Sequence, residues 1–328
     1  MRQEKIVRSM RRLATVICAI FLFCSSSVVV TGEESSAQRA EALAKYGFDP
    51  STSLESRIGE TPAAVLMAFK DAGTKPTAHF LTAGERQKVS RAFAALPPLS
   101  YRTLRERLRS FSFLDGMPNT ALTSTVNPDE PYRLFDLTIR AGILKENVSE
   151  FLTKKERTCF ETSNSSLNVH IQGGRLEAIV YVLLHEATHI VDGSLQMTPK
   201  TDPGDQSYAT SFTKGVWSGR TKLAPRYRNN VLESIVFRAN GKVLSIDQAE
   251  AVYKALSRTP FVSLYGSNNW HDDLAEAVAW YHLSEKLKQP YRIEIRKEGK
   301  VIFVYEPMKS RLVRSRLDQM KRFYQSER

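Results

Sequence analysis

Cysteine is scarce in this sequence: its 328 residues include three, Cys18, Cys24 and Cys159. After residue 30 the sequence has no apolar run long enough to span a membrane as a helix, and it has no internal repeats or low-complexity stretches. Hydrophobic residues make up 42% and charged residues 25%, as in ordinary globular proteins. These features exclude a multi-span membrane protein, a collagen-like fibre and a disordered tail, and the length suits one large domain or two small ones.

The first 32 residues have the pattern of a secretory signal peptide. Five basic residues precede an apolar run from Leu13 to Val30, and polar residues follow Gly32. Regions in this order predict a signal peptide over residues 1–32 that is cleaved near Gly32. The alternative is an uncleaved anchor, because the run approaches the roughly 20 residues of a spanning helix. We therefore expect an exported protein, periplasmic or secreted, with no stable membrane insertion once the signal is cleaved.

Signal cleavage would lower both the net charge and the number of cysteines in the mature protein. It would remove five of the 47 basic residues and one of the 35 acidic residues, so the net charge would fall from +12 to +8. Cys18 and Cys24 would leave with the signal, and Cys159 alone can form no intramolecular disulfide. The remaining positive charge is typical of a solvated basic face, and it gives no reason to expect a nucleic-acid partner.

Residues 33–130 read as a helical N-terminal region. Helices are expected over 63–72, 85–96 and 101–111, and Thr82 with Glu85 forms a capping box at the start of the second. The arginines of the third helix spread around its circumference, which indicates a solvated surface. The stretch over 115–131 is rich in Pro, Asn, Thr and Gly and is predicted to be a hinge.

Residues 131–306 read as the catalytic domain, and 307–328 as a basic C-terminal helix. Because strands and helices are mixed in no regular alternation, the sequence predicts the α+β class. The elements expected in the domain are strands over 132–140 and 167–172, a buried helix over 175–192, a second helix over 272–288 and a hairpin over 291–305. A long polar segment over 194–230 separates the two helices, and loops of that length are usually functional or disordered.

The strongest motif is His185-Glu186-Ala187-Thr188-His189 on the buried helix. Positions i and i+4 lie on the same helix face, so His185 and His189 can present two imidazole nitrogens to one Zn²⁺ ion. Glu186 is close enough to act as general base on a zinc-bound water, whose pKa zinc lowers to about 7. Because two histidines in apolar surroundings need a partner, we expect one zinc ion per chain.

A catalytic zinc site needs a third protein ligand, which is commonly a carboxylate. The candidates are Asp272 and Glu276, which stand four residues apart on one face of the later helix. Alanines beside them keep this helix slim, so it can approach the motif helix closely. His271 points away from the ligand face, and His282 reads as an exposed or capping residue.

The pairing of this motif with a later helix that carries two carboxylates resembles the gluzincin zinc peptidases. The resemblance is closest to the catalytic domain of anthrax lethal factor and its relatives, in which a Tyr-Gly segment and an Asn precede that helix. It covers about residues 168–288 and implies a zincin-like fold. It also implies zinc ligation by His185 and His189, with Glu186 as base and Tyr265 as the phenol that stabilises the oxyanion.

The resemblance further implies that Asp272 is the third ligand and that Glu276 orients a ligand histidine. The sequence departs from the family pattern here, because Asp272 replaces a longer glutamate. Either the two helices lie about 1 Å closer, or Glu276 binds the metal instead; we prefer Asp272. Asp192 either caps the turn after its helix or contacts a ligand histidine. The strand over 167–172 is either the cleft edge that pairs with extended substrate, as the resemblance implies, or an ordinary interior strand.

The leading hypothesis is an exported zinc metallopeptidase, an endopeptidase, that hydrolyses peptide bonds of a protein or peptide substrate with metal-activated water. One alternative is a non-catalytic, zinc-stabilised binding protein whose basic face docks an anionic partner. Glu186 and Tyr265 speak against it, since structural zinc needs neither residue. Another alternative is a zinc hydrolase that acts on cell-wall material. The sequence leaves the natural substrate and the oligomeric state open.

Overall fold

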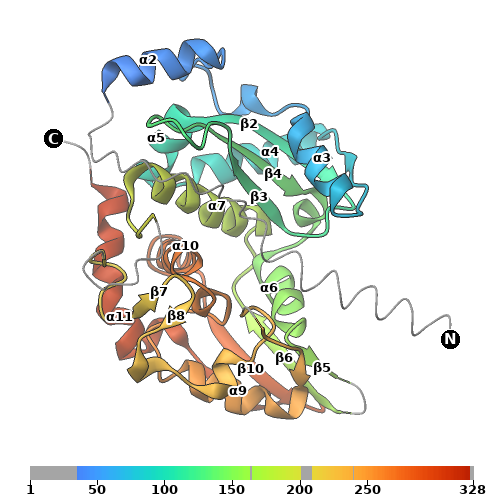
Figure 1. Ribbon diagram of the computed structural model, residues 1–328. Coiled ribbons are helices and arrows are strands. Elements are labelled where there is room, and N and C mark those ends of the chain that lie inside the picture. Colours follow the sequence, from blue (N-terminus) through green and yellow to red (C-terminus); the bar gives the residue numbers. More distant parts are fainter. Residues whose placement is uncertain (1–34, 163–164, 201–208, 239, 326–328) are drawn as a thin grey trace.

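The computed structural model describes residues 35–162, 165–200, 209–238 and 240–325 (Figure 1). The expected signal peptide, residues 1–32, lies outside this part of the chain. Within the described residues, no helix has both the length and the apolar composition to cross a membrane. Helices and strands are mixed along the chain, which confirms the α+β class.

One sheet has the strand order β1-β2-β4-β3 and lies above the central helix α7 in Figure 1. Its strands are β1 (Thr77–Ala78), β2 (Leu108–Asp115), β4 (Phe135–Arg140) and β3 (Ala121–Thr125). β2 and β4 run parallel, whereas β3 pairs antiparallel with β4 and forms one edge of the sheet.

This sheet corrects two expectations about the N-terminal half. The helix expected over 101–111 ends at Arg107, and β2 begins at Leu108, because Phe111 and Phe113 enter the core through parallel pairing with β4. The expected hinge over 115–131 contains β3. Since β3 and β4 form one sheet across the boundary expected at residue 130, residues 33–130 are neither purely helical nor a separate unit.

Short helices cover the sheet and the N-terminal side of the protein. The capping box of Thr82 and Glu85 is confirmed at the start of α4. Phe93 of this helix packs on Phe111 of β2, with ring centroids 5.3 Å apart. The helices of this half are α2 (Ser36–Lys45), α3 (Ala63–Asp71), α4 (Ala83–Ala94) and α5 (Pro98–Arg107).

Two buried helices form the centre of the molecule. α7 (Ala178–Leu195) is apolar on most sides and crosses the middle of Figure 1 between the first sheet and α10 (Trp270–Tyr281). A π-helical turn, His282–Lys286, continues α10. The main hydrophobic core joins both helices to both larger sheets. The backbone positions of side chains on α7 and α10 are therefore fixed by core packing.

The second sheet has the order β11-β10-β6 and lies on the opposite side of α7 from the first. It contains β6 (Leu167–Gln172), β10 (Arg292–Lys297) and β11 (Lys300–Tyr305), all antiparallel to their neighbours. The expected hairpin is confirmed, and its turn has positive φ at Glu298 and Gly299, as tight hairpin turns require. The helices α6 (Val148–Arg157) and α9 (Ala249–Leu256) pack nearby.

The remaining elements are short, and most of them lie in or near the long polar segment and the C-terminal region. The segment contributes a small two-stranded ladder and a 3₁₀ turn, Pro225–Tyr227, and α8 begins at its end. The expected C-terminal helix is shorter and continues as a 3₁₀ helix, Asp318–Tyr324. Leu317, Met320 and Phe323 are buried at a spacing of three residues, which a 3₁₀ helix places on one side. These elements are β5 (Phe160–Glu161), β7 (Trp217–Gly219), β8 (Lys222–Leu223), α8 (Asn230–Glu233), β9 (Leu244–Ser245) and α11 (Arg311–Leu317).

Candidate metal centre

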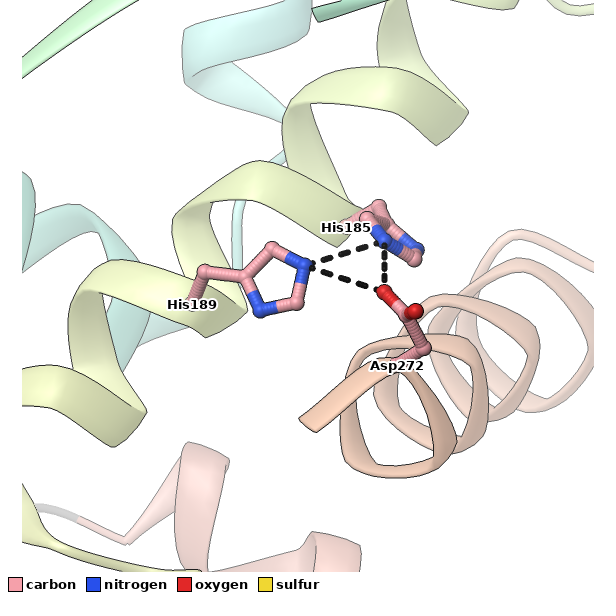
Figure 2. Close-up of side chains that lie close together, drawn as sticks. All are labelled: His185, His189 and Asp272. Carbon is pink, nitrogen blue, oxygen red and sulfur yellow. Dashed lines mark hydrogen bonds and ion pairs between the residues drawn. The ribbon is translucent and has the colours of Figure 1, made fainter. Parts of the chain in front are cut away.

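His185, His189 and Asp272 converge where α7 packs against α10, and their side chains point toward one another in Figure 2. The two histidine Nε2 atoms lie 3.1 Å apart. Asp272 Oδ1 lies 3.5 Å from each of them. Ligands about 2.0–2.1 Å from a tetrahedral zinc ion are about 3.3–3.4 Å from one another. The three atoms therefore have the separation that one such ion requires.

Glu276 lies beside His185 and not among the three converging atoms. Its carboxylate accepts hydrogen bonds from His185 Nδ1 at 3.0 Å, from Ser263 Oγ at 2.6 Å and from the Tyr181 hydroxyl. Because a carboxylate can only accept, Nδ1 of His185 carries a proton, so in the neutral imidazole the lone pair is on Nε2, the atom that faces His189 and Asp272. This is the tautomer that metal ligation at Nε2 needs.

The second oxygen of Asp272 is held by two asparagines. Asn268 and Asn269 donate to Oδ2 through their Nδ2 atoms, at 2.9 and 2.6 Å. Asn269 is also the N-cap of α10 and accepts from the backbone N–H of Asp272 at 3.0 Å. Neither role was predicted from the sequence, although Asn directly before a helix is a known capping signal.

Charge in the centre is arranged to favour a cation. Burial opposes ionisation of Asp272, yet its contacts with the two histidines hold its pKa well below the usual range. Burial also opposes charge on His185, but hydrogen bonds to Asp272 and Glu276 raise its pKa to about 9. Glu276 stays ionised despite burial, with a pKa lowered to about 2 by Lys155 and His185.

Glu186 is on the same helix and more exposed than its neighbours, whose side chains face the core. It directly follows His185 in the chain. Its Oε2 atom accepts a hydrogen bond of 2.7 Å from Thr123 Oγ1 on β3. Glu186 and half-buried His189 thus mark the accessible side of the centre.

Tyr265 is also at the centre. Its ring centroid lies 5.7 Å from that of His185 and 5.3 Å from that of Phe237. The Nζ atom of Lys155 lies 3.4 Å from the Tyr265 ring centroid, at the distance of a strong cation–π contact. Sequence reasoning did not single out Lys155, because α6 is remote from the motif in the chain.

Three other candidates lie outside the converging group. Asp192 accepts from the backbone N–H of Thr198 at 2.7 Å and from His271 Nδ1 at 2.8 Å. It therefore caps the following turn and pairs with His271, and the contact with a ligand histidine that we weighed is not formed. His282 is buried and pairs with Tyr324 at 2.5 Å, so it is not exposed, and it is the C-cap residue of α10, which was the other role expected for it.

The strand next to Glu186 is β3 and not the strand over 167–172. β3 packs against α7 and supplies Thr123, whereas β6 pairs with β10 in the other sheet and is covered by α6. This arrangement differs from the expectation, because residues 121–125 lie within the expected hinge.

Comparisons with family models, with curated proteins and with solved structures found no match to this chain.

Proposed function

We propose that this chain is an exported zinc-dependent metallopeptidase with a zincin-like fold. The observation that carries the proposal is that two histidine Nε2 atoms and Asp272 Oδ1 lie within 3.5 Å of one another. Glu186 directly follows one of these histidines, His185, in the chain. Bound zinc would supply Lewis acidity and would lower the pKa of a coordinated water to about 7. Its ligands would be His185, His189 and Asp272.

The surrounding residues have distinct parts in this proposal. Glu276 fixes the orientation and tautomer of His185, as acidic partners of metal-binding histidines do. Glu186 accepts the proton of the attacking water and passes it to the leaving amine. Tyr265 donates a hydrogen bond to the oxyanion that forms on the scissile carbonyl. All of these groups lie on or beside the buried α7 and α10.

The free edge of β3 is the proposed binding site for the substrate backbone. Among the described residues β3 pairs with β4 on one side only, and its side chains are half-buried or exposed. An extended peptide can add to such an edge through main-chain hydrogen bonds. Because β3 also lies beside Glu186, a peptide seated there would present its backbone near the proposed base. A protein or peptide substrate fits this edge.

The low exposure of the centre favours a second candidate, a zinc-stabilised binding protein without catalysis. The side chains of His185, His189 and Asp272 are 7%, 15% and 10% exposed. However, the cluster formed by the described residues has three members, and structural zinc sites usually have four protein ligands. The three-ligand set and the half-exposed Glu186 support the catalytic proposal better.

Glu186→Gln separates the two candidates. We expect this variant to keep zinc and to lose hydrolysis of a peptide library by about 100-fold to 10,000-fold, the usual contribution of a general base. His189→Ala should lose both zinc and activity, whereas the matched variant His170→Ala, altered on β6, should keep both. Zinc content is measured by atomic absorption, and cleavage by mass spectrometry of the library.

Equal cleavage by wild type and Glu186→Gln would refute the assigned mechanism, and wild-type protein without zinc would refute the site. A zinc-loaded wild type that cleaves no peptide would instead favour the binding protein. Cleavage confined to cell-wall material would favour a cell-wall hydrolase.

A further inference from the structure

Thr123 reaches from the sheet to the proposed base on the helix. Its Oγ1 atom donates to Glu186 Oε2 at 2.7 Å, across 63 positions of the sequence. Thr123 is in the middle of β3, in register with Leu137 of β4, which is fully buried. A β-branched residue in a strand has few side-chain rotamers. The sheet therefore fixes the position of this hydroxyl independently of α7.

Glu186 needs such a partner because its helix does not hold its carboxylate. The residue is half-buried, and a glutamate side chain has three rotatable bonds, which a helix position alone does not fix. The Thr123 hydroxyl donates its hydrogen bond to Oε2 of Glu186 and not to Oε1. One oxygen is then anchored to the sheet and the other is available to accept a proton.

We propose that Thr123 is a positioning residue that aims Glu186 in the peptidase reaction. The inference rests on the proposed function and extends it from the helix motif to β3. The strand whose free edge would seat the substrate backbone also holds the base that acts on the water. β3 would thus position both the substrate backbone and the Glu186 carboxylate. Small errors in the alignment of reacting groups lower the rate strongly.

The test compares Thr123→Val, which removes the hydroxyl at nearly constant shape, with Thr123→Ser, which keeps it. We expect Val to lower kcat roughly tenfold, a part of the contribution of a general base. KM should change less than twofold, since the backbone edge of β3 is intact. Ser should restore kcat to within about threefold of wild type. The control is Thr77→Val, at an exposed position of β1 on the opposite edge of the same sheet.

A second measurement does not depend on turnover. In metal-free protein, Thr123→Val and Glu186→Ala each remove the same hydrogen bond. The double variant should therefore shift the urea midpoint of unfolding by less than the sum of the two single shifts. Zinc content of Thr123→Val should equal that of wild type, because Thr123 contacts none of the three converging atoms.

The outcomes separate this inference from the proposed function. If wild type cleaves peptides and Thr123→Val has an unchanged kcat, the positioning role is wrong and the peptidase assignment stands. Failure of Ser to restore kcat, or additive shifts in the unfolding midpoint, would also overturn the positioning role. A wild type that binds zinc and hydrolyses nothing would overturn both.

Discussion

Replacing one carboxylate oxygen by an NH₂ group at Asp272 or at Glu276 tests which of the two residues is a ligand of the proposed zinc ion. The two residues are four positions apart on α10, and both are buried. In the structure, Asp272 Oδ1 faces the two Nε2 atoms, whereas Glu276 faces His185 Nδ1. The variants Asp272→Asn and Glu276→Gln keep the shape of each side chain, so their effects on zinc affinity can be compared directly.

Glu276→Gln should weaken zinc binding by about tenfold. The amide oxygen can still accept from His185 Nδ1 and the Tyr181 hydroxyl, while the NH₂ group donates to Ser263 Oγ. What disappears is the charge: a hydrogen bond to a charged group stabilises by about 1.5–3 kcal/mol, and a neutral one by about 0.5–1.5 kcal/mol. The difference, about 1–1.5 kcal/mol, lies at the low end of the measured effects of such partners on metal affinity.

Asp272→Asn should weaken zinc binding by at least about a hundredfold. Structural zinc sites with four ligands bind with about 10–16 kcal/mol, or about 3 kcal/mol for each ligand. The amide also conflicts with its neighbours, because Asn268 and Asn269 both donate to the Oδ2 position. An NH₂ group there would face two donors, and turned around it would face the metal.

The assay is a zinc titration against a chromophoric chelator of known affinity at constant pH. Glu285→Gln is the matched control, since this exposed glutamate follows α10 in the π-helical turn. Its zinc affinity should equal that of wild type. If Glu276→Gln lost more affinity than Asp272→Asn, Glu276 would be the ligand, and the reasoning from the atomic separations would be refuted.

Two further predictions concern buried charges away from the metal. Burial raises the pKa of Glu156 from 4.5 to about 7. The stability that the folded protein has with Glu156 protonated is therefore fully present below pH 4.5 and is lost as the pH rises through 7. Urea unfolding should show Glu156→Gln more stable than wild type at pH 8, by up to about 3 kcal/mol, with no difference near pH 4.5; an equal difference at both pH values would contradict this. Arg316→Met should cost about 3–5 kcal/mol in the same assay, because it leaves the buried Asp273, 2.6 Å from Arg316, without its cation. The control Arg314→Met changes an exposed arginine of the same helix and should have little effect; equal losses would refute a role for the buried pair.

Local sequence patterns were sufficient to predict much of the central helix pair. The helix expected over 175–192 corresponds to α7, because its apolar run is long and continuous. The capping box at Thr82 and the turn at Glu298-Gly299 depend on neighbouring residues alone, and both formed as expected. The four-residue spacing of His185 and His189 likewise places both on one helix face, whatever the rest of the fold is.

Long-range pairing was the part that the sequence did not reveal. β3 looks like a loop from its composition, and it is a strand because β4 offers it a partner. Asp192 could have turned to a ligand histidine or to His271, and the choice depends on how α7 and α10 pack. Thr123 and Lys155 meet the centre only after separate elements fold together, so no local pattern marks them.

The charge of the centre explains why it would hold a divalent cation inside a basic protein. Asp272 and Glu276 are both buried, and their lowered pKa values keep both ionised beside two imidazoles. Two buried negative charges are costly without compensation, and the raised pKa of His185 shows that a proton can supply part of it. A divalent cation would balance both carboxylates and release that proton. Glu186 would stay outside this balance, on the accessible side of the centre, with Thr123 as its hydrogen-bond partner.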